Sequence, residues 1–413
     1  MNTRITFGIV GTGGIFYGWG GGSGHLPACP WVADEARLAA ICDLSEKNLK
    51  RAAEAVKIIY AEKAAAQRVI GNNELADLLV ADGENLKLYT NLDEMLRSEK
   101  LDFVDVITPC EHHSTAVKKA LAAGCHVLCE KPLARTWLES EEIVKDVTTA
   151  GKILLYGENL IYADPYYDVK KLIQKGELGE LEAMWIPFSG SEPGNYSYPR
   201  GGVGALLDNG IHAITLSWFL TGFDYAPKRV KALFPDGVST RIKQRFIDGV
   251  IKELNVEDYA GFVVEFENPA SGHWVNAYLE ASWAFDDAGV FKAVGSRGEI
   301  KMVDGKITVT DQFGNNHVRD IYHPSFLNMG LPPGYGGHPQ QLKAMVRLVK
   351  ENATPLCDVK IGSESLSIAQ AVYLSEAKGK KAVTLSEFKE YAKTFENNHE
   401  GLLRELLKTG IRR

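Results

Sequence analysis

Two short segments of the chain carry side chains that could bind or deprotonate a reacting hydroxyl group. The first is Glu130-Lys131-Pro132, which directly follows the apolar run 126–129. Open α/β sheets place ligands at the carboxyl ends of their strands, and a partly desolvated lysine there can hydrogen-bond a substrate oxygen and shift its pKa toward function. Most lysines are solvated surface charges, so the motif needs support from the rest of the chain.

The second segment holds Asp208 and His212, four residues apart in a glycine-rich stretch. On a helix both side chains would project from one face. A carboxylate and an imidazole placed together can share proton transfer, and the neutral pKa range of histidine suits a general base. Gly210 costs a helix roughly 1 kcal/mol relative to alanine, so we expect another element to pack closely against it. The alternative is an ion pair without a catalytic role.

A third candidate site is a glycine turn, Gly11–Gly13, which follows the apolar run 5–10. Glycines there permit a tight turn and let the backbone approach a pyrophosphate. Asp43 closes the next strand and would accept hydrogen bonds from a ribose diol while repelling a 2′-phosphate, which favours NAD over NADP. The alternatives are a structural turn and, for Asp43, a helix N-cap, for which Ser45 competes. The nearby cluster Gly18–Gly24 is either a flexible insertion or a loop around the phosphates.

Strand-like and helix-like segments alternate through the first part of the chain. This alternation predicts βαβ units and a doubly wound parallel sheet, the α/β Rossmann arrangement. The expected strands are 5–10, 37–43, 86–90, 103–109 with its turn, 126–129 and 152–156, and the expected helices are 45–69, 91–97, 113–123 and 138–150.

The pattern changes after about Glu158, where strands begin to follow one another with few helices. This predicts a second, α+β domain with a large, mostly antiparallel sheet. We expect a nucleotide-binding domain over 1–157 and a second domain over 158–413, with C-terminal helices able to pack back on the first; the family resemblance described below implies that the second domain binds substrate and forms the oligomer. The expected strands are 229–234, 261–266, 274–284, 290–294 and 306–310, and the expected helices are 165–175, 204–220, 339–350 and 363–378.

Composition excludes several classes of function. The 413 residues include 46 Lys and Arg against 53 Asp and Glu, a net charge of −7, which argues against broad binding to nucleic acid or anionic membranes. No apolar run approaches the ~18 residues that cross a bilayer. The strand-like stretch begins by Ile5, so we expect no signal peptide. The 6 cysteines lack a Cys-x-x-Cys pair, which favours buried thiols in a reducing cytoplasm.

Segments along nearly the whole chain resemble the Gfo/Idh/MocA family of NAD(P)-dependent oxidoreductases, which includes glucose–fructose oxidoreductase and inositol dehydrogenase. The order and separation of the EKP and D-x-x-x-H elements make the resemblance specific. It implies a Rossmann domain and an open-faced α+β domain, with cofactor and substrate in the cleft between them. The matching segments are GTGG at 11–14, VITPCEHHSTAVKKALAAGCHVLCEKPLA at 106–134, GELGELE at 176–182 and GGVGALLDNGIHAITLSWFLTG at 201–222.

The resemblance also implies roles for individual residues. Lys131, Asp208 and His212 match the family's catalytic lysine, aspartate and histidine. With the T-P-x-x-x-H turn and the EKP glutamate added to the glycine turn, the expected cofactor-binding residues are Gly11, Thr12, Gly13, Gly14, Ile15, Asp43, Thr108, Pro109, His113, Glu130 and Lys131. The expected substrate-binding residues are Lys131, Asn159, Tyr162, Tyr196, Arg200, Asp208, His212 and His338.

Four positions depart from the family pattern. Phe16 replaces the third small residue of the glycine fingerprint, and Cys110 stands where asparagine is common. The segment 162–165 lacks a frequent Arg-Phe pair, and Thr215 replaces a frequent aspartate. The difference at 162–165 predicts a substrate pocket unlike that of the commonest sugar dehydrogenases.

The resulting hypothesis is oxidation of a secondary alcohol on a sugar, glycoside or cyclitol by NAD. His212 would take the hydroxyl proton, Lys131 would polarise the oxygen, and Asp208 would orient the substrate or Lys131. One alternative is an NAD-dependent glycosidase, because Gly334–His338 resembles a segment of some such members, although it could be a simple turn. The other is a non-catalytic NAD-binding sensor, against which the intact catalytic set counts.

The sequence predicts no metal site. His112 and His113 are adjacent, while His25, His323 and His338 have no ligand-type residue at local spacing. The expected partners are a carbohydrate or polyol substrate and further copies of the chain, as a dimer or tetramer formed through an exposed sheet face.

Overall fold

The computed structural model describes residues 4–18, 23–189, 203–235, 237–247, 249–254, 256–285, 289–303, 306–320 and 337–408. The chain divides into two compact units. The first contains the chain up to Leu133, Glu142–Ala163 and Pro324–Lys360, and the second contains the remainder. Each unit therefore combines three stretches of chain, whereas the sequence predicts a single boundary between 157 and 158.

A six-stranded parallel sheet forms the centre of the first unit, as predicted, in the order β3-β2-β1-β4-β5-β6. Its central strands are buried, and the rings of Phe7 and Phe103 stack across neighbouring strands with centroids 4.8 Å apart. The carboxyl ends of β1, β4 and β5 are neighbours at one edge of this sheet. The strands are β1 (Ile5–Val10), β2 (Ala36–Cys42), β3 (Lys87–Tyr89), β4 (Phe103–Val106), β5 (His126–Glu130) and β6 (Leu154–Gly157).

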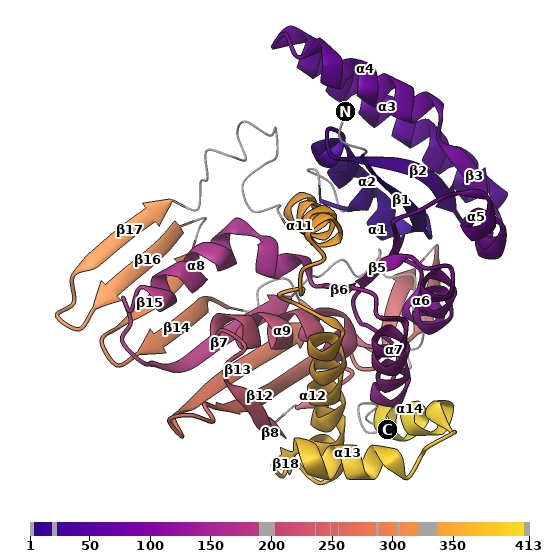
Figure 1. Cartoon of the computed structure of the whole chain (residues 1–413). Helices are drawn as coiled ribbons and strands as arrows, with labels where there is room; N and C mark the ends of the chain where they lie inside the picture. The colour runs from indigo at the N-terminus through magenta and orange to yellow at the C-terminus, as the bar shows by residue number, and fades with distance from the viewer. Residues whose placement is uncertain are drawn as a thin grey trace. The chain divides into compact units, whose positions relative to one another are not determined.

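One helix of the first unit comes from far along the chain. Helix α11 (His338–Glu351), orange in Figure 1, lies beside the indigo N-terminal elements. Its buried residues Leu342 and Met345 belong to the same core as Phe7, so α11 completes this unit's hydrophobic core. The other helices are α1 (Gly14–Tyr17), α2 (His25–Ala28), α3 (Glu46–Val69), α4 (Asn73–Glu84), α5 (Leu92–Ser98), α6 (His113–Ala122) and α7 (Trp137–Ala150), with the short 3₁₀ turns Cys29–Val32, Cys110–His112 and Asn159–Tyr162.

A ten-stranded, mostly antiparallel sheet forms the second unit, also as predicted. Its order is β17-β16-β15-β14-β7-β13-β12-β8-β18, with β9 beside β12, and β7 runs parallel to β13. Strands β10 and β11 form a separate hairpin. The strands are β7 (Leu181–Ser189), β8 (Ala226–Ala232), β9 (Val238–Ser239), β10 (Gln244–Ile247), β11 (Val250–Glu253), β12 (Tyr259–Glu267), β13 (Trp274–Ser282), β14 (Phe291–Gly295), β15 (Gly298–Val303), β16 (Lys306–Asp311), β17 (Asn316–Asp320) and β18 (Val383–Thr384).

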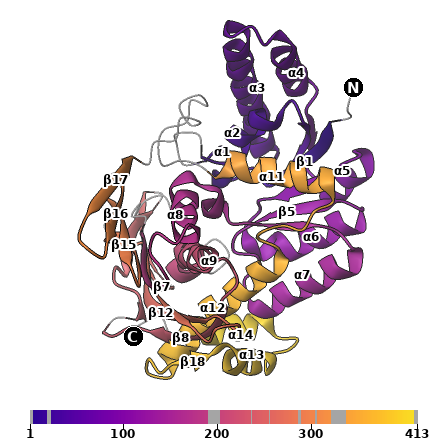
Figure 2. The same ribbon diagram turned by 60° about the vertical axis from the view of Figure 1, so that its left-hand side comes forward.

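Helices α8 (Asp164–Gln174) and α9 (Ile211–Leu220) lie on one face of this sheet (Figure 2). Every residue of α9 is buried, as its apolar sequence requires. The segment before it, Leu206–Gly210, is π-helical, so the prediction of one uninterrupted α-helix over 204–220 is wrong there. The remaining helices are α12 (Val359–Ala377), α13 (Leu385–Lys393) and α14 (His399–Leu407).

All six cysteines lie in the described part of the chain, where they are buried and form no disulfide. This confirms the expectation of buried thiols. None of the described helices combines the length and the apolar character needed to span a membrane.

Candidate functional site

Two glycines of the turn after β1 differ in what requires them. Gly11 has a φ of +100°, and a Cβ at this position would lie 2.9 Å from the carbonyl oxygen of Ile107. The fold itself therefore requires glycine here. Gly13, before α1, has a φ of −74°, and no atom of the described residues lies within 4 Å of the place a Cβ would take. Its backbone is open to close approach by a ligand.

Asp43, directly after β2, holds this turn in place. Its Oδ2 accepts hydrogen bonds from the backbone N–H and the hydroxyl of Thr12, at 2.8 and 2.7 Å. Its Oδ1 accepts from the N–H of Ser45 at 2.9 Å. The N-cap of α3 is Ser45, whose hydroxyl accepts from the N–H of Asn48. The N-cap alternative for Asp43 is therefore wrong, and its half-buried carboxylate instead organises the glycine turn.

The departures in the glycine segment have a structural basis. Phe16 is fully buried in the core of the first unit, and α1 ends after one turn. Gly18 and Gly24 both have positive φ and pack together at the base of the second glycine cluster. Residues 19–22 lie outside the described residues, so a role for this cluster at phosphates stays a prediction.

His113 lies between the two loops that follow β4 and β5. Its Nε2 lies 2.8 Å from the carbonyl oxygen of Thr108, and its Nδ1 lies 3.0 Å from that of Pro132. The ring is buried, and burial lowers the pKa of His113. The neutral ring has one N–H and donates to one of these two carbonyl oxygens, so His113 packs between the loops and is hydrogen-bonded to one of them. Thr108 is half-buried and Pro109 exposed.

Lys131 directly follows β5, next to a carboxylate whose two oxygens are both engaged. Glu130 Oε2 accepts the backbone N–H of Lys131 at 3.1 Å, and Oε1 lies 3.1 Å from Nε2 of His25. The other ring nitrogen of His25 lies 2.6 Å from Oδ2 of Asp105 in β4. Burial alone would raise the pKa of Glu130, but the hydrogen bond and charge of His25 lower it to about 2.

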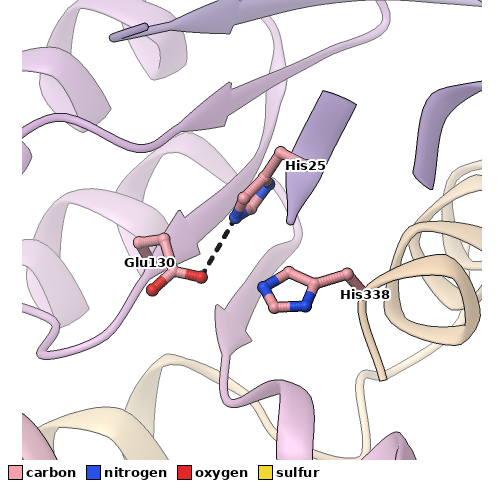
Figure 3. A group of neighbouring side chains, drawn as sticks. All are labelled: His25, Glu130 and His338. Carbon is pink, nitrogen blue, oxygen red and sulfur yellow. Dashed lines mark hydrogen bonds and ion pairs between the residues drawn. The ribbon is translucent and has the colours of Figure 1, made fainter. Parts of the chain in front are cut away.

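His338 joins this group from the start of α11 (Figure 3). Its ring centroid lies 5.2 Å from that of His25, and the ligand-type atoms of His25, Glu130 and His338 all lie within 4.8 Å of one another. The sequence predicts no metal site because these histidines lack local partners, and the tertiary structure supplies the partners. One sequence signal was overlooked: Asp105 is an acid inside the apolar run 103–107, and a buried carboxylate needs a partner.

Asp208 and His212 lie on consecutive turns of different geometry in the second unit. Asp208 belongs to the π-helical segment and is half-buried, and its Oδ2 accepts a hydrogen bond from Nε1 of Trp283 at 3.2 Å. His212 lies in the first turn of α9 and is 7% exposed, with its ring centroid 5.0 Å from that of Phe188. π-Helical turns are rare in proteins, but those that occur are often found at functional sites.

Neighbouring elements anchor this segment. A Cβ at Gly210 would lie 3.3 Å from Cβ of Ala281 in β13, which confirms the expected close packing. Glu257, buried just before β12, accepts hydrogen bonds from the N–H of Leu206 at 3.1 Å and from the hydroxyl of Tyr373 at 2.6 Å. The π-helical segment is therefore fixed at its start by a buried acid.

Glu257→Gln is expected to remove a pH dependence of stability. Burial raises the pKa of Glu257 from 4.5 to about 7, so the folded protein holds a proton that the unfolded chain has released between these pH values. This contribution is complete below about pH 4.5 and is lost as the pH rises through about 7, a decline of roughly 3 kcal/mol. Glutamine keeps an acceptor oxygen without titrating.

Urea unfolding at about pH 5 and about pH 8 measures this effect. The free energy of unfolding of Glu257→Gln, relative to wild type, should increase by about 2–3 kcal/mol between the two conditions. The matched control is Glu253→Gln, at an exposed position in β11. Parallel pH profiles for Glu257→Gln and wild type would contradict the expectation.

The other expected substrate-binding residues have separate fates. Asn159 and Tyr162 lie in the 3₁₀ turn after β6 and are half-buried. Tyr196 and Arg200 lie outside the described residues. His338 is buried against His25, and its contact with substrate stays a prediction.

Comparisons with known proteins agree with both units. The family model "Oxidoreductase family, NAD-binding Rossmann fold" matches residues 5–158, and the "GFO/IDH/MocA C-terminal domain" matches residues 166–301. An uncharacterised oxidoreductase of Schizosaccharomyces pombe is 31% identical over 194 residues, which cover 46% of this chain and 48% of that protein. The chain thus spans about half the length of that relative.

Two relatives have named activities. Myo-inositol 2-dehydrogenase of Thermotoga maritima is 24% identical over 304 residues, 73% of this chain and 85% of that protein. D-glucoside 3-dehydrogenase of Escherichia coli is 28% identical over 215 residues, 49% of this chain and 58% of that protein. The fold is also that of an oxidoreductase from Agrobacterium radiobacter, which was solved in complex with NAD+, L-tartaric acid and magnesium. The two structures superpose with a TM-score of 0.68 at 18% sequence identity, over 93% of this chain and 99% of that one. With a Rossmann unit and a C-terminal unit that both match, the chain belongs to the GFO/IDH/MocA family of NAD-binding oxidoreductases.

Proposed function

We propose that the protein oxidises a secondary alcohol of a sugar, glycoside or cyclitol with NAD. The observation that carries this proposal is the placement of Lys131. It follows β5 at the same sheet edge as Gly11 after β1 and Thr108 after β4, and these three strands are neighbours. A lysine that could hydrogen-bond a substrate hydroxyl therefore follows a strand at the edge where Rossmann sheets bind their dinucleotide, which supports the proposal. The named activities of the two dehydrogenase relatives support the substrate class.

The residues at this edge fit a dinucleotide. Gly13 leaves open space at its backbone, and Gly13 and Gly14 are both exposed at the start of α1. The Oγ1 of Thr108 is buried and has no hydrogen-bond partner within the described part of the chain. Asp43 places a carboxylate beside the glycine turn. Gly11–Ile15, Asp43, Thr108, Pro109, Glu130 and Lys131 would then hold the cofactor.

Each catalytic side chain has a distinct proposed role. His212 accepts the proton of the substrate hydroxyl, Lys131 hydrogen-bonds and polarises the same oxygen, and Asp208 orients the substrate or Lys131. Bound NAD supplies the hydride acceptor. The hydrogen bond from Trp283 to Asp208 would keep that carboxylate in one orientation. Asn159 and Tyr162 are the described candidates for further substrate contacts.

Asp43→Asn is expected to weaken the preference for NAD over NADP. Loss of the negative charge removes repulsion of a 2′-phosphate, while an acceptor oxygen remains for Thr12. The ratio of kcat/KM with NAD to that with NADP should fall about tenfold, the effect of roughly 1.4 kcal/mol. Asp102→Asn is the matched control, because Asp102 accepts the N–H of Thr6 at the opposite end of the sheet. An unchanged ratio in Asp43→Asn would remove Asp43 from the selection of the cofactor.

The experiment that tests the function is a screen of myo-inositol, methyl β-D-glucoside and glucose 6-phosphate with NAD, followed by the absorbance of NADH. Net NADH formation that disappears in His212→Asn supports the proposal. Release of 4-nitrophenol from 4-nitrophenyl β-D-glucoside without net NADH would replace it with the glycosidase. NADH binding without turnover of any of these compounds would favour the sensor.

Neither alternative is proposed. The glycosidase hypothesis rests on Gly334–His338, of which Gly334–Gly336 lie outside the described residues. Gly337 packs against the carbonyl oxygen of Asn159, and His338 is buried.

We further propose a cytoplasmic homo-oligomer, dimer or tetramer. The buried thiols support the compartment, and Trp185 and Trp274, each 39% exposed on the large sheet, support the oligomer.

A further inference from the structure

Three titratable side chains from separate elements form a buried chain behind Lys131. His25 in α2 stands between Asp105 in β4 and Glu130 in β5, at 2.6 Å and 3.1 Å. The side chains of all three are at most 7% exposed. No part of the proposed chemistry uses His25 or Asp105. A buried arrangement of this kind is costly to maintain unless each charge is compensated.

The geometry specifies the protonation state of His25. Each ring nitrogen faces a carboxyl oxygen, so with both acids ionised both nitrogens must carry hydrogen to make the two hydrogen bonds. Burial raises the pKa of Asp105, while the charge and hydrogen bond of His25 oppose that rise. Burial disfavours the imidazolium, but Asp105 and Glu130 outweigh it and raise the pKa of His25 to about 10. The groups facing His25 are these two acids, the ring of His338 and the thiol of Cys29, which donates to the carbonyl oxygen of His25.

A doubly protonated His25 ring is suited to hydrogen-bonding the two carboxylates and unsuited to binding a metal ion. An imidazolium has no lone pair for an ion, and it already compensates the charge of the two carboxylates. His25, Glu130 and His338 have the ligand types and the spacing of a metal site. His25, however, donates to Glu130 where a bound metal would have to sit between them (Figure 3).

We propose that His25 is a positioning residue for Lys131: held by Asp105, its buried imidazolium fixes the carboxylate of Glu130, which in turn fixes the main chain that carries Lys131. The second half of the link is the hydrogen bond from the Lys131 N–H to Glu130 Oε2 at 3.1 Å. His113 packs against the following residue, Pro132, with its Nδ1 3.0 Å from the carbonyl oxygen. Lys131 thus lies between two points in contact with buried histidines. This inference rests on the proposed role of Lys131.

Asp105→Asn tests the positioning role of His25 while preserving the volume of the side chain at residue 105. Asparagine still offers an oxygen to Nδ1 of His25 but removes one of the two charges that stabilise the imidazolium. His25 should then lose its second ring proton at lower pH, and the neutral ring no longer compensates the charge of the Glu130 carboxylate. We expect the alkaline limb of kcat to move down by at least one pH unit, with the Kd for NADH changed less than threefold. Hydrogen–deuterium exchange of the peptide containing Lys131 should rise over the same pH range.

The matched control is His126→Gln. His126 lies at the other end of β5, where its Nδ1 accepts the N–H of Ile153 at 3.0 Å. This change should leave both the pH limb and the exchange of the Lys131 peptide as in wild type. Turnover is measured with the fastest-oxidised compound of the screen described above.

A double-mutant cycle separates positioning from general destabilisation. His25→Gln should lower kcat 10- to 100-fold in the wild-type background and less than twofold in the Lys131→Met background, because it acts through Lys131. Equal factors in both backgrounds would overturn the proposal. So would a stoichiometric metal, measured by mass spectrometry of the purified protein, that is lost in His338→Gln.

The outcomes also separate this inference from the proposed function. Wild-type turnover in Lys131→Met would overturn the role of Lys131, while the exchange measurement would still decide whether His25 fixes its main chain. An inactive Lys131→Met together with an Asp105→Asn variant unchanged in both the pH limb and the exchange would overturn this inference alone.

Discussion

Replacing Lys131 with methionine is expected to lower kcat/KM roughly 1,000-fold, the scale of losing a positioned proton-transfer or hydrogen-bonding group. Methionine keeps an unbranched chain of similar length but cannot donate to the substrate oxygen. The main-chain hydrogen bond from residue 131 to Glu130 remains possible, so the turn should persist. Steady-state kinetics with the substrate found in the screen measures the loss. Because Lys131 is one of several residues proposed to hold the cofactor, the Kd for NADH in a fluorescence titration should rise far less, by about tenfold at most.

Lys119→Met is the control for loss of a lysine in the same unit. Lys119 lies on α6, has a side chain that is 40% exposed and pairs with Asp93 at 2.7 Å. A surface pair of this kind contributes about 0–1 kcal/mol to stability, so turnover should not change. A Lys131→Met enzyme with wild-type kcat/KM would refute the catalytic assignment. One that no longer binds NADH would show that Lys131 serves the cofactor instead.

Replacing Gly11 with alanine is expected to lower stability, whereas replacing Gly13 with alanine is expected to lower the affinity for NADH. Gly11→Ala combines positive φ with a backbone contact at 2.9 Å, and should cost about 3 kcal/mol of stability, roughly 10 °C in Tm. Gly13→Ala meets no atom within 4 Å in the described part of the chain and has an ordinary φ of −74°, so Tm should change by less than about 2 °C. Its added methyl instead occupies the space that a pyrophosphate needs, and NADH affinity should fall about tenfold or more.

Thermal unfolding without cofactor and NADH titration of both variants separate the two roles. Gly71→Ala, at the exposed end of α3, serves as the control for positive φ alone, since no atom lies near its Cβ position. Wild-type NADH affinity in Gly13→Ala would place the cofactor away from this turn. An unchanged Tm in Gly11→Ala would contradict the close contact with Ile107.

Local pattern predicted the elements whose signal is strong within a short stretch. The apolar run 5–10 is β1, the helix expected over 45–69 is α3, and the first unit contains the predicted parallel sheet. The pattern does not predict α4, although Asn72 caps it, nor β7, which pairs with β13 in parallel across a long stretch of chain. Pairing between distant segments leaves little trace in local periodicity.

The candidate site likewise has features that local sequence motifs mark and features that depend on contacts between distant segments. Sequence alone marked Lys131, Asp208, His212 and the glycine turn, because each stands in a motif whose residue types and spacing carry a chemical reason. It could not separate Gly11 from Gly13, since the difference is a φ angle and a neighbour on another strand. Nor could it show that Asp208 belongs to a π-helical turn, which depends on Glu257 and β13 packing against that segment.

The sequence by itself determined the fold class, the family and the residues that could do the chemistry, because alternation, glycine turns and short motifs are local. Only the tertiary structure decided which buried titratable groups contact one another and so compensate each other's charge. His25, Asp105 and Glu130 lie far apart in the chain, and three elements of one sheet unit bring them within hydrogen-bond distance. Burial then makes each charge depend on the others, and no pattern along a chain records that dependence.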